Sequence, residues 1–200
     1  EINIDWLDQG GTSQIMRYIR SEYRNSPEGI GVDLLFGGGL DPFIRLTDAD
    51  MTVAWMLPDS IIDRIPESFA GIPLYDPAGH WYGAAMSGFG IIYNSAAARM
   101  QGSEPPTSWE DMADPTLLGW IAAGDPRMSG SVHMAYEIML QAYGWERGWE
   151  IVTALCANSR SFARSAGDIP LGVSRGDAVA GMAIDFYAWS EINKAEGQEL

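Results

Sequence analysis

The sequence is poor in cysteine and in positive charge. Cys156 is the only cysteine in 200 residues, so no disulfide can form within the chain, and cysteine usage leaves the cellular compartment open. The 12 Lys and Arg residues stand against 27 Asp and Glu residues, which gives a formal net charge of −15. Nucleic acids and anionic membrane surfaces need a basic protein surface, so this balance argues against both as partners. It still permits a small anion, which backbone amides and one arginine can hold.

Long apolar runs and common catalytic motifs are also missing. No stretch of about 18 apolar residues occurs, so the sequence predicts no transmembrane helix. There is no Gly-x-Ser-x-Gly motif, no phosphate loop ending in Gly-Lys-Ser/Thr and no paired-cysteine zinc spacing. His133 and Glu137 lie four residues apart on one predicted helix, but two ligands make an incomplete metal site. We therefore predict a protein with no metal, no cofactor and no enzymatic activity.

Apolar residues make up 46% of the chain, enough for a substantial core, and they fall in alternating strand and helix patterns. The predicted strands are 2–6, 31–36, 89–93, 120–123 and 178–184. The predicted helices are 15–23, 131–142, 145–158 and 188–200, with short ones near 60–65 and 171–175. Strands that alternate with helices predict an α/β fold.

The most informative stretch is Asp125-Pro-Arg-Met-Ser-Gly-Ser131, which joins the predicted strand 120–123 to the predicted helix 131–142. The first-turn amides of a helix have no intrahelical partner, and the helix dipole adds partial positive charge there. Such a helix start is suited to binding an anion. Ser129 and Ser131 can cap the helix, contact a ligand, or do both, and capping alone is the simpler interpretation.

Small residues follow a predicted strand at two more places. Gly10-Gly-Thr-Ser13 follows strand 2–6, and Gly37-Gly-Gly39 follows strand 31–36. Glycine allows close approach of the backbone to a ligand. Because ligands of open α/β sheets bind at the carboxyl ends of strands, the three junctions together predict a binding cleft.

Five elements, taken in order, resemble bacterial extracellular solute-binding proteins of ABC transporters, in the branch that binds ferric iron, phosphosugars and phosphonates. These elements are Gly10-Gly-Thr-Ser13, Phe36-Gly-Gly-Gly39, Ser87-Gly-Phe-Gly-Ile-Ile-Tyr-Asn94, Pro106–Pro115 and Asp125–Ser131. In order and spacing the resemblance covers nearly the whole chain. It implies a two-lobe type II periplasmic-binding-protein-like fold with mixed sheets, in which a ligand is clamped between the lobes.

The resemblance also implies how the chain is divided and where the protein is located. Crossing segments are expected near Ile91–Asn94 and Ile184–Tyr187, so lobe one is predicted as residues 1–93 plus 186–200 and lobe two as residues 94–185. The chain is expected to be truncated at both ends relative to the family, with an export signal upstream of Glu1. A periplasmic or extracellular location follows, with a lipid anchor as one form of it.

The function implied is a monomeric receptor that delivers a small solute to the permease of an ABC importer. The residues that we expect to contact the solute are Gly11, Thr12, Gly38, Gly39, Ser87, Gly88, Arg127, Ser129, Gly130, Ser131, Asp185 and Tyr187. Backbone amides and the guanidinium only donate hydrogen bonds, and the serine and threonine hydroxyls can also donate, which suits an anionic solute bearing phosphate or carboxylate, with Arg127 as the candidate counter-charge. Asp185 and Tyr187 are expected to orient a polar or cationic part of the ligand.

One departure from the family argues against iron as the ligand. Iron-binding relatives use an adjacent Tyr-Tyr pair, whereas this sequence has Asp185-Phe-Tyr-Ala188 with one tyrosine. Iron(III) needs several hard anionic oxygens. Two alternatives to a transport receptor stay open from the sequence: an enzyme on a similar scaffold, such as a deaminase or transferase of small polar metabolites, and a sensor domain of a larger receptor.

Overall fold

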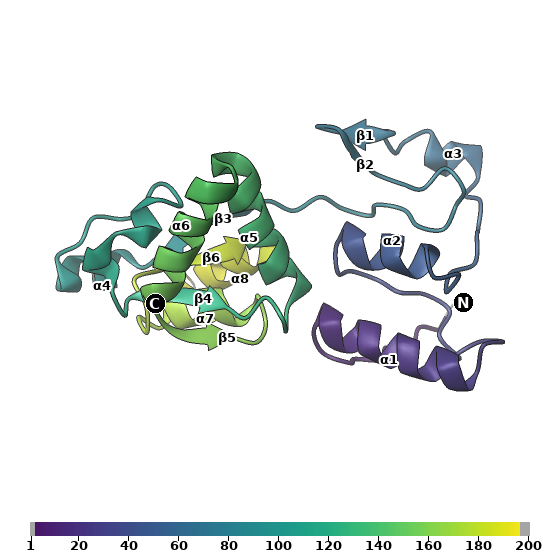
Figure 1. The fold of residues 1–200 in the computed structure, drawn as a ribbon, viewed down its shortest axis with the longest axis horizontal. Helices are drawn as coiled ribbons and strands as arrows, with labels where there is room; N and C mark the ends of the chain where they lie inside the picture. The colour runs from purple at the N-terminus through teal and green to yellow at the C-terminus, as the bar shows by residue number, and fades with distance from the viewer. Residues whose placement is uncertain (1–2, 197–200) are drawn as a thin grey trace. The chain divides into compact units, whose positions relative to one another are not determined.

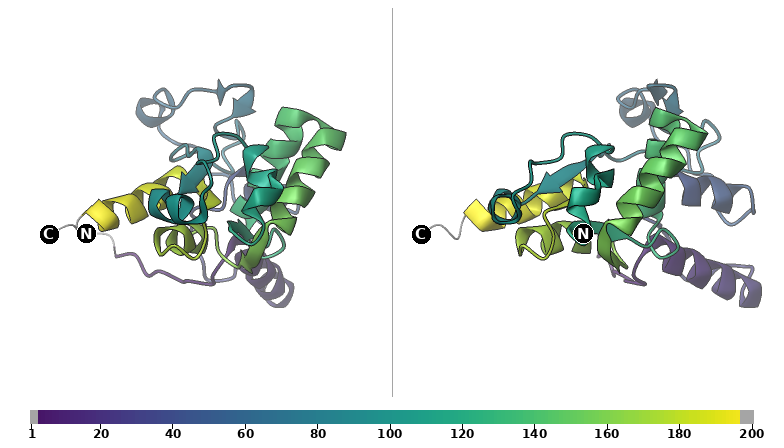
Figure 2. Two further views of the ribbon diagram at one scale, coloured as in Figure 1. Left: turned by 90° about the vertical axis from the view of Figure 1, so that its left-hand side faces the viewer. Right: turned by 60° about the vertical axis from the view of Figure 1, so that its left-hand side comes forward.

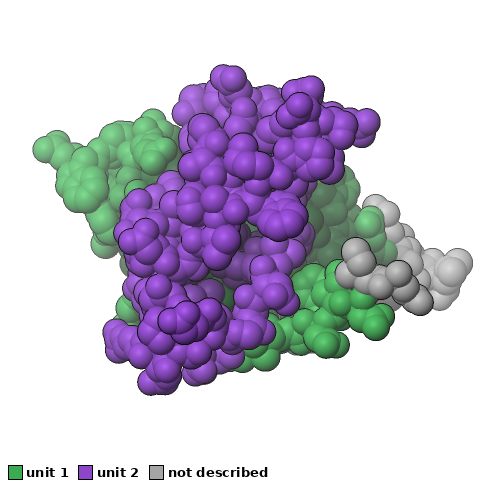
Figure 3. Space-filling model, turned by 90° about the vertical axis from the view of Figure 1, so that its right-hand side faces the viewer, with its two compact units in different colours: residues 1–15, 87–200 green, residues 16–86 purple. Residues whose placement is uncertain are grey.

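The computed structural model describes residues 3–196, and the chain divides into two compact units. Unit 1 consists of residues 1–15 and 87–200, and unit 2 consists of residues 16–86, as coloured in Figure 3. None of the described helices is long and apolar enough to cross a membrane.

Unit 1 is built on a four-stranded mixed sheet (Figure 1). In spatial order its strands are β3 (Phe89–Tyr93), β6 (Ala180–Ile184), β4 (Ile121–Gly124) and β5 (Ser159–Ala163). Strand β4 is parallel to both β5 and β6, whereas β3 is antiparallel to β6 with Phe89 opposite Ile184. The carboxyl ends of β4, β5 and β6 therefore lie at one edge of the sheet, together with the amino end of β3. We call this the carboxyl edge.

The helices of unit 1 connect and cover these strands. They are α4 (Ser95–Gln101), α5 (Gly130–Tyr143), α6 (Trp145–Ala157), α7 (Asp168–Ser174) and α8 (Asp185–Glu196), with single 3-10 turns η1 (Asp111–Ala113) and η2 (Pro115–Leu117). Helices α5 and α6 pack against each other, as both views of Figure 2 show. Met112, Met139, Leu155 and Ile169 are fully buried between these helices and the sheet, and they form the centre of the hydrophobic core.

One asparagine fixes the chain direction after β3. The side-chain oxygen of Asn94 accepts hydrogen bonds from the amides of Ala96 and Ala97, both at 3.0 Å, and so caps α4. Its side-chain nitrogen donates to the carbonyl of Val173 in α7 at 3.0 Å. The Tyr-Asn element of the sequence thus ends a strand, starts a helix and ties that helix to a second one.

Unit 2 contains little regular structure. Its helices are α1 (Thr12–Asn25), which begins in unit 1, α2 (Leu40–Thr47) and α3 (Asp59–Ile62). Two-residue strands β1 (Ser68–Phe69) and β2 (Ile72–Pro73) pair antiparallel.

The mixed α/β fold predicted from the sequence is confirmed, and so are β3, β4, β6 and the long helices α1, α5 and α6, each to within a few residues. Two predicted strands are wrong. Residues 3–10 and 32–37 form no strand, and Ile2 lies outside the described residues. Trp6 is 77% exposed and Leu34 is 76% exposed, because no other strand of the described chain pairs with either segment. A strand needs a hydrogen-bonded neighbour, which neither the alternation in 2–6 nor the apolar run in 31–36 supplies.

The two units differ in extent from the predicted lobes, residues 1–93 plus 186–200 and residues 94–185. Residues 1–15 and α8 group with the strands that we predicted as lobe two. The units describe contacts within 200 residues, whereas the predicted lobes refer to a whole two-lobe protein. The lobe assignment therefore stays a prediction.

The packing of α6 on α5 depends on Gly148. A Cβ at this position would lie 2.7 Å from the Cα of Leu140 and 3.3 Å from the carbonyl oxygen of Met139.

We expect Gly148→Ala to lower the free energy of unfolding by about 1–3 kcal/mol, since backbone atoms of α5 must move. Gly172→Ala in α7 is the matched control, because no described atom lies within 4 Å of its added Cβ. Helix propensity should make the control about 0.5–1 kcal/mol more stable than wild type. Urea denaturation measures both, and a stabilised Gly148→Ala would contradict the close helix contact.

Candidate functional site

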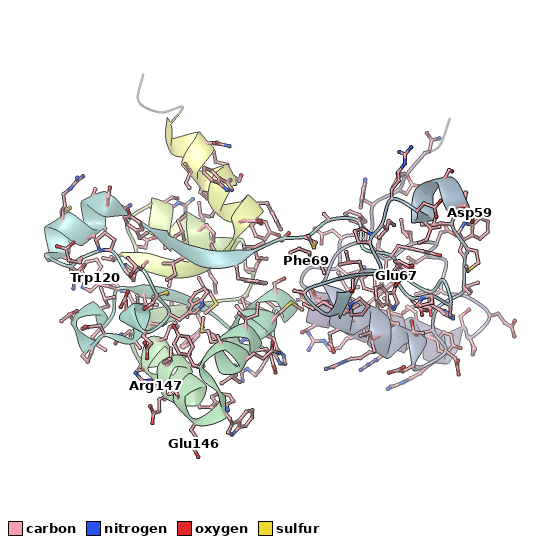
Figure 4. The ribbon with its side chains drawn as sticks, turned by 90° about the horizontal axis from the view of Figure 1, so that it is seen from above. Asp59, Glu67, Phe69, Trp120, Glu146 and Arg147 are labelled. Atoms are coloured by element: carbon pink, nitrogen blue, oxygen red, sulfur yellow. The ribbon has the colours of Figure 1, made fainter. Side chains whose placement is uncertain are left out.

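The carboxyl edge of the sheet in unit 1 gathers most of the residues that the sequence predicts as ligand contacts. Asp125 follows β4, Arg164 follows β5, Asp185 follows β6, and Gly88 precedes β3. Trp120, labelled in Figure 4, directly precedes β4 and marks the opposite edge. The parallel strands bring the first three loops to this edge, and the antiparallel pairing of β3 with β6 adds Gly88, which is 97 residues from Asp185 in the sequence.

Ser129 starts α5 and caps it. Its backbone is extended, with φ −121° and ψ 119°, and its hydroxyl oxygen accepts a hydrogen bond from the amide of Val132 at 3.4 Å. Its carbonyl accepts from the amide of His133. Ser129 is 6% exposed, so its hydroxyl is enclosed by the helix start. The amides of Gly130 and Ser131 are the first-turn donors that α5 itself does not use.

The start of α1 lies beside the start of α5, and both belong to unit 1. A Cβ on Gly11 would be 2.9 Å from the carbonyl oxygen of Met128, and a Cβ on Gly130 would be 3.2 Å from the Cβ of Thr12. The two glycines therefore allow a backbone approach that larger residues would prevent. The amide of Gly11 is already engaged, since it donates to the side-chain oxygen of Gln14 at 2.9 Å.

Arg127 is paired with Asp125 at the turn before α5. The guanidinium donates to the two carboxylate oxygens at 2.9 and 2.7 Å, and the backbone amide of Arg127 donates to the same group at 2.9 Å. These bonds lower the pKa of Asp125 to about 2. The side chain of Arg127 is 86% exposed. The residue predicted as the ligand's counter-charge thus has its charge neutralised within its own turn.

Asp185 joins the two chain segments at the end of the β3–β6 pair. One carboxylate oxygen accepts from the amide of Gly88 at 3.0 Å, and the other accepts from the amide of Phe186 at 2.7 Å. The amide of Asp185 donates in turn to the carbonyl of Gly88 at 3.0 Å. Asp185 therefore holds the backbone at this corner. Tyr187 is 38% exposed, and its ring lies against Gly167.

The remaining predicted contacts are placed as follows. Ser87 is exposed and directly precedes Gly88. Gly38 and Gly39 belong to unit 2. They adopt φ values of 91° and 76°, which favour glycine, and they lead directly into α2.

Arg164 and Ser165 are the residues of this edge that sequence reasoning missed. They follow β5, a strand that we did not predict because Ser159-Arg-Ser-Phe-Ala163 is polar and lies at the outer side of the sheet. The order of strands and helices along the chain does indicate a further strand after α6. A helix that follows a buried parallel strand commonly leads back to another strand of the same sheet, so a strand after α6 was to be expected.

Within the described residues, no group of three or more His, Cys, Asp or Glu side chains is arranged to hold a metal ion. His133 Nε2 and Glu137 Oε1 are 3.2 Å apart on the exposed side of α5, and together they supply only two ligands.

Comparisons with known proteins show which class of protein has this fold. The family model for bacterial extracellular solute-binding proteins matches residues 49–195, and the chain belongs to this family. The predicted type II periplasmic-binding fold is confirmed by solved structures. The chain is similar to AfuA from Actinobacillus pleuropneumoniae, solved with exogenous fructose-6-phosphate bound, at a TM-score of 0.75 and 23% identity over 92% of this chain and 56% of that one. It is also similar to iron-bound HitA from Pseudomonas aeruginosa, at a TM-score of 0.72 and 22% identity over 94% and 56%. These identities show the fold alone.

Two relatives are similar in sequence. The chain is 33% identical over 104 residues to the phosphoglycerate transport regulatory protein PgtC of Salmonella typhimurium, which covers 52% of this chain and 26% of PgtC. It is 25% identical over 194 residues to an uncharacterized protein of Haemophilus influenzae, covering 94% and 53%. The chain thus spans about half or less of the length of these relatives.

The pairing of Asp125 with Arg127 predicts a pH dependence. The pKa of Asp125 is lowered from 3.8 to about 2, so the pair contributes to folding stability above pH 3.8, and this contribution is lost as pH falls towards 2. An NMR titration of the Asp125 carboxyl carbon should give a pKa near 2. In Arg127→Ala the value should return part of the way to 3.8, because the backbone hydrogen bond stays. Asp114, whose pKa is lowered by Thr116, should be unchanged and serves as the internal control. An Asp125 value unaffected by Arg127→Ala would show that the ion pair is not its cause.

Proposed function

We propose that the protein is a periplasmic or extracellular receptor that binds a small anionic solute and delivers it to the permease of an ABC importer. The observation that carries this proposal is the packing of two helix starts, those of α1 and α5, at the carboxyl edge of unit 1. Membership in a family of binding proteins supports a receptor over an enzyme.

Two helix starts side by side concentrate hydrogen-bond donors. Each start leaves first-turn amides without intrahelical acceptors and carries roughly half an elementary positive charge from the helix dipole. The unused amides are those of Thr12 and Ser13 in α1 and those of Gly130 and Ser131 in α5. Because the whole chain has a net charge of −15, an anion must be held by such local donors against an unfavourable overall charge.

Phosphate esters are the first ligand class to test. PgtC is named for phosphoglycerate transport, and AfuA was solved with fructose-6-phosphate. We propose a solute that bears phosphate or carboxylate, bound by Thr12, Gly130 and Ser131 and near Ser129 and Gly88. Gly38 and Gly39 are proposed to supply further amides from lobe one, residues 1–93 plus 186–200, to which Thr12 is also assigned.

Transport requires a signal that the solute is bound. We propose that the solute bridges the two lobes and stabilises a closed form by its higher affinity for that form, and that the permease recognises this form of a monomeric receptor. Under this proposal Asp185 holds the corner at Gly88 from which the chain passes between lobes.

Two serine variants test the site. Ser131→Ala removes a hydroxyl donor and keeps the backbone amides, so affinity for phosphoglycerate, fructose 6-phosphate or inorganic phosphate should fall about ten- to a hundred-fold. Ser129→Ala is the matched control, because its hydroxyl caps α5. It should lose about 1 kcal/mol of stability.

Calorimetric titration and thermal melts on both variants separate the two roles. Wild-type affinity in both variants would leave the capping of α5 by Ser129 as the one role of these two hydroxyls and would contradict the proposed contact of Ser131 with the solute. Failure of all three anions to bind the wild-type protein would remove the proposed ligand class.

Iron is not the proposed ligand, although HitA is an iron-bound structure of this fold. Asp185-Phe-Tyr-Ala188 offers one phenolate, and both oxygens of Asp185 accept hydrogen bonds from backbone amides. We expect ferric citrate to produce no visible tyrosinate-to-iron absorption band. A strong band that disappears in Tyr187→Phe but persists in Tyr93→Phe, an exposed control tyrosine, would show that the metal binds after all.

A further inference from the structure

The loop after β5, residues 164–167, begins at the carboxyl edge and carries Arg164, whose guanidinium has no hydrogen-bond or ion-pair partner within residues 3–194, although its charge helps to lower the pKa of Asp125. We infer that Arg164, and not Arg127, supplies the positive charge that pairs with the anionic group of the solute. This inference rests on the proposed function and names the residue that sets its charge preference.

The sheet register places Arg164 next to the turn that leads to α5. Gly124 of β4 lies opposite Ala163 of β5, and the amide of Asp125 donates to the carbonyl of Ala163 at 2.8 Å. The chain therefore leaves both strands side by side, with Arg164 and Asp125 as the first residues beyond them. Four residues further on from Asp125 is Ser129, the cap of α5.

The other end of the loop contacts the segment that follows β6. A Cβ on Gly167 would lie 3.3 Å from Cε1 of Tyr187, so the loop and this tyrosine are in close contact. The loop is shaped by Ser165, whose hydroxyl oxygen accepts from the amide of Gly167 at 3.3 Å and whose carbonyl accepts from the amide of Asp168 at 3.2 Å. The loop therefore begins at Arg164, beside the exit of β4, and at its other end contacts the segment that follows β6.

Arg127 and Arg164, the two arginines of this edge, differ in whether a carboxylate of the protein is paired with them. Both carboxylate oxygens of Asp125 are taken by Arg127, so this pair adds no net charge. Arg164 is exposed, and within residues 3–194 its guanidinium has no hydrogen-bond or ion-pair partner. Of the other carboxylates that follow these strands, Asp185 is engaged by backbone amides, and Asp168 lies in the first turn of α7.

A guanidinium in this position suits the proposed ligand class. Its planar donors match two oxygens of a phosphate or carboxylate, and it stays charged at every physiological pH. The helix starts supply hydrogen bonds from neutral amides, whereas Arg164 supplies a full charge. Removing it should therefore weaken doubly charged phosphate esters more than singly charged anions.

The test compares three arginine variants by calorimetric titration with phosphoglycerate, fructose 6-phosphate and inorganic phosphate. Arg164→Ala should raise the dissociation constant about ten- to a hundred-fold, as expected for a lost charge-assisted hydrogen bond. The double variant Arg127→Ala with Asp125→Asn removes both charges of the neutral pair and should change the dissociation constant less than about twofold. Arg160→Ala is the control for net charge, because Arg160 is exposed near the opposite end of the same strand.

Arg164→Gln keeps a long polar side chain and removes the charge. It should lose nearly as much affinity as Arg164→Ala, and it shows whether the loss in alanine comes from the missing charge or from a disturbed loop. Wild-type affinity in both Arg164 variants, or an equal loss in Arg160→Ala, would overturn the inference and leave the proposed function in place. A loss confined to the double variant Arg127→Ala with Asp125→Asn would assign the charge to Arg127 instead. Failure of all three anions to bind the wild-type protein would overturn the proposed function, and the inference with it.

Discussion

Strand β6 is the element on which unit 1 depends. All five of its residues are buried, and it pairs with β3 on one side and with β4 on the other. Small side chains make this position feasible. A Cβ on Gly181 would lie 2.6 Å from the side chain of Ile169 in α7 and 2.8 Å from the carbonyl oxygen of Ala122 in β4. The approach of helix and neighbouring strand to β6 fixes the sheet, and the sheet in turn fixes where each loop begins.

The site follows from chain direction more than from any single residue. Three parallel strands deliver their loops to one edge, and the antiparallel β3 delivers Gly88 to the same edge. Donors that are weak individually are collected there: unused amides of two helix starts, the hydroxyl of Ser131 and one unpaired guanidinium. Acidic groups are also present, but Asp125 and Asp185 are each engaged by hydrogen-bond donors of their own chain. Under the proposed function, this division is what lets an acidic protein present an anion with a local surface of donors.

The sequence predicted those parts of the fold that depend on burial. Runs such as Ile121–Gly124 and Ala180–Ile184 are apolar because both faces of the strand are covered, and they were found. Strand β5 is an edge strand with polar residues, so its pattern carried no such signal. The predicted strands 2–6 and 31–36 show the reverse case. Alternation in the first and an apolar run in the second are typical of strands, but no described strand pairs with residues 3–6 or 32–36. Only part of the candidate site could be predicted, because sequence motifs indicate where a helix starts but not which side chains pair. Motifs placed Ser129 and Gly130 at a helix start, but the pairing of Arg127 with Asp125 and the engagement of the Gly11 amide by Gln14 are side-chain geometries that spacing does not encode.

The two roles of Asn94 have a chemical consequence. Its oxygen caps α4 while its nitrogen holds the carbonyl of Val173, so the residue works only as an amide. Direct hydrolysis of that amide would leave an aspartate and an unchanged backbone. The carboxylate would cap α4 as well as before, but it would present an anionic oxygen to a carbonyl oxygen and would repel α7. One spontaneous covalent change would thus preserve the helix and loosen its attachment, a form of damage that total helix content would not detect.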